Sequence, residues 1–165
     1  MHFSKQGIVA AVITLVFVGS IAFAQEHRVV AQEKQVLFVC EHGNVKSLMA
    51  MTYFNRLAQE RGLPFRAVSR GTAPDSTTVP PKVMEALKGD GFNVSAFHPV
   101  AVKAADVSTS QQVITMGVDL PKEAESSKSK TERWDDVPPA SVDFGAARDS
   151  IMAHVRKLID QLAKP

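Results

Sequence analysis

Only one cysteine, Cys40, occurs among the 165 residues, so no disulfide can form within the chain. An excess of one charge is also missing: the sequence has 19 basic and 17 acidic side chains, and the basic residues are scattered. We therefore expect no nucleic-acid partner, because proteins that bind nucleic acid concentrate basic residues in one patch. No internal repeat is present, and no spacing of histidine, aspartate and glutamate predicts a metal site.

The chain length and the 45% of hydrophobic residues suffice for one globular domain with a proper core. The first 24 residues are set apart from that domain. Lys5 gives a positive start, Ile8 to Val18 is an apolar run of eleven residues, and Ala22-Phe23-Ala24 has the small residues of a cleavage site. This pattern predicts a signal peptide over residues 1–24, cleaved after Ala24, and hence a periplasmic or secreted protein.

An uncleaved anchor is the alternative for this segment. The apolar stretch becomes eighteen residues long if it is counted from Gly7 to Ala24, which is just enough to span a bilayer. We expect contact with a membrane only in that case. Residues 25–34 are polar and show no periodicity, so we interpret them as a tether before the folded domain, which takes residues 35–165.

The stretch from Val36 to Ala50 organises the rest of the chain. Its apolar, β-branched start predicts a buried strand, and from Leu48 onward apolar residues recur at helical spacing. Cys40 therefore lies at a strand-to-helix turn, where unpaired backbone N–H groups and the positive end of the helix dipole bind oxyanions. The same field favours a thiolate over a thiol, so Cys40 is a candidate nucleophile at neutral pH.

Four neighbours favour this interpretation over the simpler one, in which a lone cysteine is a small buried hydrophobic residue. Gly43 and Asn44 tolerate the positive φ angles of a loop that is wrapped around an anion. Lys46 adds a cation, and Ser47 offers a hydroxyl close to the sulfur. The stretch thus predicts an anion-binding loop with a reactive thiol.

The rest of the sequence alternates strands and helices. The expected strands are Gln35–Val39, Pro64–Ser69, Gln112–Met116 and Thr131–Trp134, and the expected helices are Ser47–Arg61, Lys82–Lys88 and Phe144–Leu162. We expect loops over Arg70–Pro81 and Lys122–Lys130, and a polar break that Asp106 precedes. This order predicts an α/β fold, a single-domain doubly wound four-stranded parallel sheet with helices on both faces. Ligands of such sheets bind at the carboxyl ends of the strands, where Cys40 lies.

The segment from Cys40 to Ser47 resembles the phosphate-binding loop of the low-molecular-weight protein tyrosine phosphatase family, which includes thioredoxin-coupled arsenate reductases. That loop reads Cys, five residues, Arg, then Ser or Thr, directly after the first strand. Here the spacing is kept, but Lys46 occupies the arginine position. The similarity continues through Arg70–Pro74, Val113–Gly117 and the closing helix, and it covers Gln35 to Leu162.

Other parts of the chain depart from the family's pattern. Family members carry an Asp-Pro pair whose aspartic acid protonates the leaving oxygen, and this chain has none. Asp136 is the nearest candidate for that acid and Asp135 the second, while Pro138 occupies the position that aligns best without a gap. The Cys-x-His start, with His42, is closer to the arsenate reductases, but these keep two further cysteines. A self-contained cysteine relay is therefore excluded.

The resemblance implies a cysteine-dependent phosphatase of the protein tyrosine phosphatase type. A thiolate would attack phosphorus, loop amides would hold the phosphate oxygens and a carboxylic acid would protonate the leaving group, with no metal or cofactor. The expected catalytic residues are Cys40, Lys46, Ser47 and Asp136, and the expected phosphate-binding residues are Glu41, His42, Gly43, Asn44, Val45, Lys46 and Ser47.

The expected substrate is a phosphorylated small molecule or a phosphotyrosine peptide. We expect slow turnover, because the ammonium of Lys46 lacks the bidentate grip of a guanidinium on phosphate oxygens. Two alternatives stay open. One is a non-catalytic module that binds phosphate or another oxyanion, and the other is an arsenate reductase that uses an external thiol as its reductant.

Overall fold

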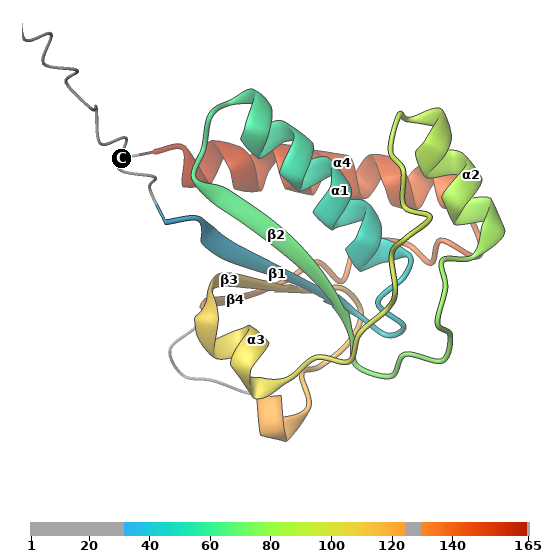
Figure 1. Ribbon diagram of the computed structural model, residues 1–165, viewed down its shortest axis with the longest axis horizontal. Coiled ribbons are helices and arrows are strands. Elements are labelled where there is room, and N and C mark those ends of the chain that lie inside the picture. Colours follow the sequence, from blue (N-terminus) through green and yellow to red (C-terminus); the bar gives the residue numbers. More distant parts are fainter. Residues whose placement is uncertain (1–31, 125–129, 165) are drawn as a thin grey trace, which may run out of the picture. The chain divides into compact units, whose positions relative to one another are not determined.

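The computed structural model of the protein describes residues 32–124 and 130–164 (Figure 1). The predicted signal peptide, residues 1–24, and the tether up to residue 31 lie outside the described residues, so cleavage, anchoring and export stay predictions. Within the described residues, no helix combines the length and hydrophobicity that crossing a membrane requires.

One sheet of four parallel strands, in the order β2-β1-β3-β4, forms the centre of the domain. The strands are β1 (Lys34–Cys40), β2 (Phe65–Gly71), β3 (Ser110–Thr115) and β4 (Lys130–Arg133). In the central strand β1, the residues from Val36 to Val39 have no exposed surface. Because both faces of this strand are covered, its sequence is a continuous apolar run instead of an alternating one.

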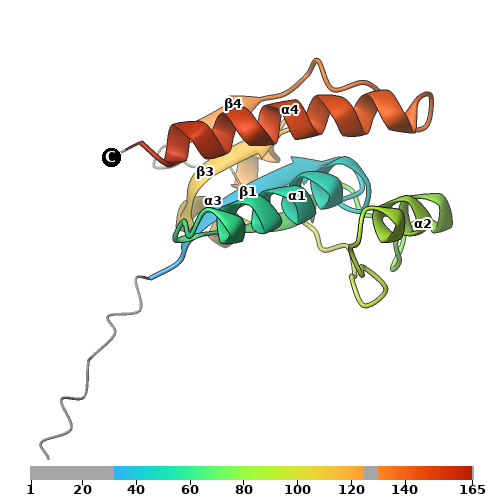
Figure 2. The same cartoon turned by 90° about the horizontal axis from the view of Figure 1, so that it is seen from above.

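Helices cover both faces of the sheet (Figures 1 and 2). The helices α1 (Lys46–Glu60), α2 (Pro81–Gly89) and α4 (Phe144–Leu162) contribute to the larger apolar core, and α3 (Ala104–Thr109) and the 3₁₀-helix η1 (Lys122–Ala124) contribute to a smaller one. The final helix has the predicted bounds, and its residues Ile151, Val155 and Ile159 are fully buried.

The central strand supplies side chains to both cores. Val36 and Phe38 belong to the larger core, whereas Leu37 and Val39 belong to the smaller one. This is the alternation expected of a strand, whose successive side chains point to opposite faces. The predicted doubly wound parallel α/β sheet with helices on both faces is therefore confirmed.

Two local predictions are wrong. Arg70 and Gly71 belong to β2 and not to a loop, because they continue the pairing with β1 opposite Val39 and Cys40. Asp106 lies inside α3 and does not mark a break. Its carboxylate accepts a hydrogen bond of 2.9 Å from the backbone N–H of Lys103 and so caps the helix, which with six residues is too short to show an apolar stripe.

The region expected as a loop over Lys122–Lys130 contains regular secondary structure at both of its ends. It begins with η1, and its last residue is the first residue of β4. Residues 125–129 lie outside the described residues. The first residues of this region therefore depart from the predicted loop.

The strand order places the functional loop. After β1 the chain forms β2 on one side of it and later β3 on the other side, so the connections diverge at the carboxyl end of β1. Open α/β sheets bind their ligands at such a point. Cys40 is the last residue of β1 and lies there.

Candidate active site

Two glycines allow the loop after β1 to lie against the end of β2. Gly43 has a φ of +73°, and a Cβ atom placed on it would lie 2.6 Å from the backbone nitrogen of Gly71. A Cβ atom on Gly71 would in turn lie 2.7 Å from the carbonyl carbon of His42. Both distances are too short for any side chain, so only glycine at both positions permits this backbone approach.

Gly71 is a site residue that the pattern analysis did not assign. Its place in the sequence, at the end of a strand and before Thr72, gave no sign of a partner 28 positions earlier in the chain. Two further hydrogen bonds hold the loop: the Thr72 N–H donates to the Cys40 carbonyl at 3.0 Å, and the Ala73 N–H donates to the Glu41 carbonyl at 2.8 Å. The loop is thus fixed from the β2 side.

A short chain of hydroxyl groups reaches the sulfur. Cys40 Sγ lies 3.0 Å from Ser47 Oγ, which lies 2.8 Å from Ser69 Oγ, and Ser69 Oγ lies 2.9 Å from the carbonyl oxygen of Gly43. Ser47 is fully buried and Ser69 nearly so. Ser69, on β2, is a second residue that sequence reasoning missed.

The count of protons couples this chain to the ionisation of Cys40. A hydroxyl donates one proton, and the Gly43 carbonyl can only accept. If Ser69 donates to that carbonyl, Ser47 donates to Ser69 and the sulfur must be the donor, as a thiol. If Ser69 instead donates to Ser47, then Ser47 is free to donate to a thiolate. The two hydroxyl groups can therefore support either protonation state of the sulfur by turning.

A cavity of about 370 Å³ opens beside the sulfur. Six of the predicted site residues line it, and four residues from other segments complete the wall: Cys40, Glu41, His42, Asn44, Val45 and Lys46, with Gly117, Pro139, Ala140 and Ser141. Gly43 and Ser47 do not line it and act from behind the loop. The structure therefore brings the predicted phosphate-binding loop together around one cavity, next to a segment that follows β4.

Lys46 lies where the loop passes into α1, and its ammonium group is next to the turn after β3. A Cβ atom placed on Gly117 would lie 3.3 Å from Lys46 Nζ. The Gly117 N–H donates to Asp135 Oδ1 at 3.2 Å. The cation thus stands at the rim of the cavity near a carboxylate.

Each of the two predicted acid candidates has a side-chain hydrogen-bond partner. The pKa of Asp135 is lowered, chiefly by its hydrogen bond from the Arg133 guanidinium, 2.7 Å between Nε and Oδ2. The pKa of Asp136 is lowered chiefly by its hydrogen bond with His154, whose Nε2 lies 2.8 and 2.9 Å from the two oxygens. Neither residue lines the cavity.

The position of Asp136 disfavours the role that the sequence suggested for it. Asp136 lines a different pocket, together with His154 and Lys157. Its catalytic role stays a prediction. Asp135 instead accepts a hydrogen bond from Gly117, a residue that lines the cavity. Among the described residues that line the cavity, Glu41 is the one carboxylate.

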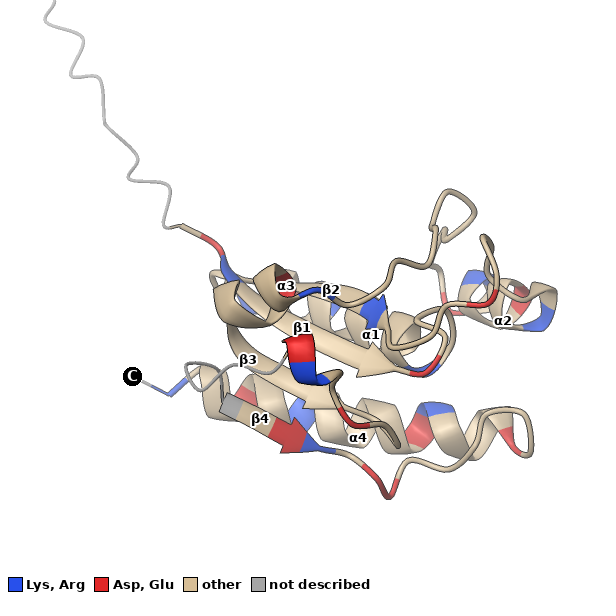
Figure 3. Ribbon diagram, turned by 90° about the horizontal axis from the view of Figure 1, so that it is seen from below, with Lys and Arg blue, Asp and Glu red and all other residues tan. Residues whose placement is uncertain are grey.

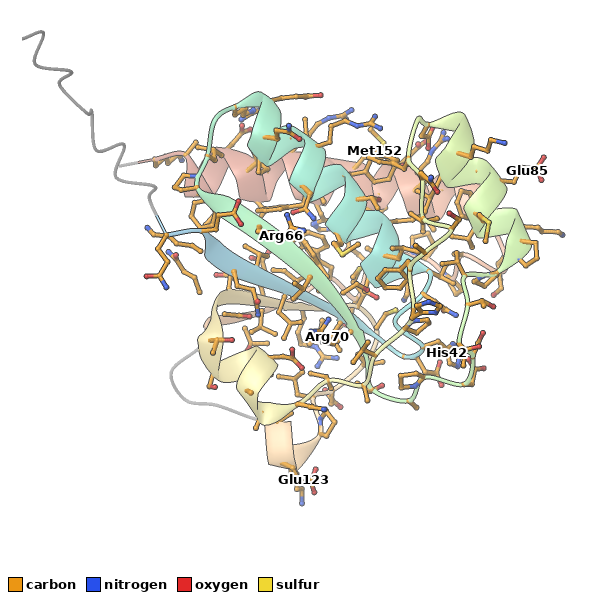
Figure 4. All side chains as sticks on the ribbon, viewed as in Figure 1. His42, Arg66, Arg70, Glu85, Glu123 and Met152 are labelled. Atoms are coloured by element: carbon orange, nitrogen blue, oxygen red, sulfur yellow. The ribbon has the colours of Figure 1, made fainter. Side chains whose placement is uncertain are left out.

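The mouth of the cavity carries further charges. His42, labelled in Figure 4, has its Nε2 atom 3.5 Å from Asp75 and 4.0 Å from Glu41. Asn44 is buried, and its amide donates to the Thr78 carbonyl at 3.1 Å, which ties the loop to the segment after β2.

No group of three or more histidine, cysteine, aspartate or glutamate side chains in the described part of the chain could hold a metal ion.

Three solved structures share this fold. An arsenate reductase from Archaeoglobus fulgidus DSM 4304 is 27% identical, with a TM-score of 0.60, and the match covers 76% of this chain and 98% of that one. A low molecular weight protein tyrosine phosphatase from T. tengcongensis is 20% identical, with a TM-score of 0.65 and coverage of 78% and 99%. At that identity, the likeness shows the fold alone.

The third structure is longer than the match. The thioredoxin-dependent arsenate reductase from Corynebacterium glutamicum is 23% identical, with a TM-score of 0.65 over 80% of this chain. The match spans 63% of that protein, less than two thirds of its length. No curated protein matched the sequence. The model of the family described as "Low molecular weight phosphotyrosine protein phosphatase" matches residues 35–165, most of the chain, and the protein therefore belongs to this family.

Proposed function

We propose that this protein is a slow cysteine-dependent phosphatase that hydrolyses phosphate monoesters through a cysteinyl-phosphate intermediate. The observation that carries the proposal is the position of the sulfur: Cys40 lines a cavity of about 370 Å³ together with the loop that wraps it. Membership of the family supports phosphatase-like or arsenate-reductase-like chemistry at this cavity. The substrate is a phosphorylated small molecule or a phosphotyrosine peptide.

The reaction has two steps. The Cys40 thiolate attacks phosphorus, so that a P–S bond forms while the P–O bond to the alcohol or phenol breaks. The alcohol or phenol leaves as its conjugate base and takes up a proton. Water then attacks phosphorus in the phosphocysteine, the P–S bond breaks, and phosphate and the thiolate are released. In this proposal, backbone N–H groups of the loop and the Lys46 ammonium stabilise the oxygens that gain charge, and the position of Lys46 in the cavity lining supports its part. Ser47 Oγ lies 3.0 Å from the sulfur, and in this proposal its hydroxyl donates a hydrogen bond to the thiolate.

Delivery of the proton is the weak step. The pKa values of Asp135 and Asp136 are both lowered by their hydrogen bonds, so each side chain is held as a carboxylate and is a poor proton donor at neutral pH. Substrates whose leaving group is stable as an anion need little help from an acid. We therefore propose that aryl esters with such leaving groups react much faster than alkyl esters.

A second function is supported by the same observation. If no acid is delivered, the loop can still bind phosphate or arsenate, and the protein then acts as an oxyanion-binding module without turnover. The presence of Lys46 at the rim favours anion binding in either case. We also propose, from the pattern of residues 1–24, that the protein acts outside the cytosol.

Rapid mixing with p-nitrophenyl phosphate separates the two functions. The phosphatase releases a burst of p-nitrophenol equal to the concentration of protein, followed by slow turnover, and the burst disappears in Cys40→Ser. Binding of phosphate without a burst would instead establish the oxyanion-binding module. Arsenate added with glutathione is a further arm, because arsenate-dependent consumption of the thiol would show arsenate reduction with an external reductant.

A further inference from the structure

A second cavity, of about 270 Å³, lies between α1 and α4 beside the end of α2. Its lining comes from three segments: Tyr53, Arg56, Leu57, Asp90, Met152 and Arg156. It shares no residue with the cavity of Cys40. Met152, labelled in Figure 4, marks its place on α4 behind α1.

The body of this cavity is apolar. Leu57 and Met152 are half-buried and pack against the larger core, and the ring of Tyr53 is buried. Small-molecule sites have this character: a mostly apolar wall with a few placed polar groups. A volume of about 270 Å³ accommodates a body of one aromatic ring.

The one carboxylate in the wall is already occupied. Asp90 accepts a hydrogen bond from the Tyr53 hydroxyl at 2.5 Å, and its other oxygen lies 3.6 Å from Arg148. Burial of the Tyr53 side chain, together with its hydrogen bond to Asp90, raises the pKa of Tyr53 above its ordinary value. The hydroxyl therefore stays protonated, and Asp90 is balanced by Arg148 and not by the arginines of the wall.

Two guanidinium groups in the wall are left without a carboxylate. Arg56 donates to the backbone carbonyl of Asp90 at 2.8 Å and lies 3.6 Å above the centre of the Phe92 ring. Arg156 is exposed. Within the described residues, neither side chain has an acidic oxygen within 4.0 Å, although many of the other arginines do.

The surroundings do not offer a general excess of positive charge that would explain this pair. Figure 3 shows lysine and arginine interspersed with aspartate and glutamate over the helices. Two unpaired guanidinium groups at one apolar cavity are therefore a local feature. The stacking of Arg56 on Phe92 also holds one of them in a fixed position.

We infer that this cavity binds a small amphipathic anion, a carboxylate on a single aromatic ring. The ring occupies the space between Leu57 and Met152, and the carboxylate accepts hydrogen bonds from Arg156 and Arg56. Guanidinium groups are suited to this task because their planar fork matches the two oxygens of a carboxylate. The inference does not depend on the proposed phosphatase activity.

The test uses benzoate as the probe and the methyl signal of Met152 in an NMR spectrum of the isotopically labelled protein. Saturating inorganic phosphate is present, so that the cavity of Cys40 is not available to the probe. We expect a saturable shift of the Met152 signal with benzoate. Benzyl alcohol, a neutral molecule of similar shape, should bind at least about tenfold more weakly, because it lacks the charge that the arginines recognise.

Matched variants locate the charge. Arg156→Gln should weaken benzoate binding about tenfold, and Arg156→Lys should weaken it less, because the charge remains while the fork is lost. Lys157→Gln is the control, since it removes the same charge from the next residue, which lines a different pocket. Thermal melting curves confirm that the variants are folded.

Three results would overturn the inference. Benzoate leaves the Met152 signal unchanged, benzyl alcohol binds as tightly as benzoate, or Lys157→Gln weakens binding as much as Arg156→Gln. None of these results bears on turnover at Cys40.

Discussion

The two sides of the Cys40 cavity are built in different ways. The loop after β1 is held by two glycines in close contact, by backbone hydrogen bonds from the end of β2 and by a chain of buried hydroxyl groups. The segment after β4 contributes Pro139, Ala140 and Ser141, and none of these can donate or accept a proton as a carboxyl group does. The carboxylates of Asp135 and Asp136 are held by Arg133 and His154.

This difference separates recognition of an anion from delivery of a proton. The first needs backbone N–H groups and a nearby cation, and the loop precedes the N-terminus of α1 and has Lys46 in the cavity lining. The second needs a carboxylic acid aimed at the leaving group, and among the described residues the one carboxylate of the lining, Glu41, belongs to the loop and not to the segment after β4. We therefore expect changes on the loop side to affect binding and attack, and changes on the other side to affect mainly the departure of the leaving group.

The largest effect is expected from removing the sulfur. Cys40→Ser should lower the rate with p-nitrophenyl phosphate by at least about a thousandfold, because no nucleophile remains. Phosphate binding, measured by isothermal titration calorimetry, should persist, since the backbone of the loop is unchanged. Equal loss of binding and turnover would show that the two sides cannot be treated separately.

Next comes the contact between the glycines. Gly71→Ala should destabilise the domain by about 1–3 kcal/mol and weaken phosphate binding, because its Cβ atom would lie 2.7 Å from the carbonyl carbon of His42. Gly89→Ala is the control, because no atom lies within 4 Å of its Cβ position. Urea denaturation measures both free energies of unfolding. An unaltered Gly71→Ala protein would contradict the close approach.

A carboxyl group on the other side should repair the missing step. Ser141→Asp places an acid at an exposed position of the cavity wall and should raise the rate with phenyl phosphate by about tenfold or more, since general acids contribute 10²–10⁴-fold when well placed. The rate with p-nitrophenyl phosphate should change much less, because that leaving group needs no proton. Ser141→Asn serves as the uncharged control. An equal gain with both substrates would argue against proton delivery as the weak step.

Substitutions of Lys46 should have a smaller effect on the rate. Lys46→Arg should raise the rate several-fold, because a guanidinium holds two phosphate oxygens at once, whereas Lys46→Met should lower it. Steady-state kinetics with p-nitrophenyl phosphate measure both. An unchanged or lower rate in Lys46→Arg would count against a role of this side chain in binding the transferred group.

The smallest effect concerns the pair of Asp136 and His154. The pKa of Asp136 is lowered in the folded protein, so its contribution to stability is present above the ordinary pKa of aspartate and is lost as the pH falls through the lowered value. The Asp136 side chain is 67% exposed, although that of His154 is only 22% exposed, and screening by solvent at the carboxylate makes the contribution small. Asp136→Asn should flatten the acid side of a plot of melting temperature against pH, with little change at neutral pH. A large loss at neutral pH would show that the pair holds the segment after β4 in place.

The sequence predicted the parts that depend on local patterns. The apolar run of β1, the apolar stripe of α4 and the glycine-containing turn after Cys40 are each legible within a few residues. Contacts between segments that are distant in the sequence could not be predicted. The close contact of Gly43 with Gly71 and the hydrogen bond from Ser69 to Ser47 join residues of different segments and leave no periodic signal.

The choice of the proton donor shows a second limit of prediction from the sequence. Sequence reasoning chose between Asp135 and Asp136 by their distance along the chain, but adjacent side chains here point to different partners, Arg133 in one case and His154 in the other. The partner of Asp136 comes from α4, eighteen residues further on. The position of His154 on α4, where its ring stacks on Trp134 directly after β4, is a long-range contact that determines the partner of Asp136.

The most direct test of the account is chemical detection of phosphate on the sulfur. The protein is mixed with p-nitrophenyl phosphate, quenched within milliseconds and analysed by peptide mass spectrometry. The account predicts one phosphoryl group on the peptide that contains Cys40, formed as fast as the burst of p-nitrophenol and absent in Cys40→Ser. Release of p-nitrophenol without any phosphorylated Cys40, or persistence of release in Cys40→Ser, would contradict it.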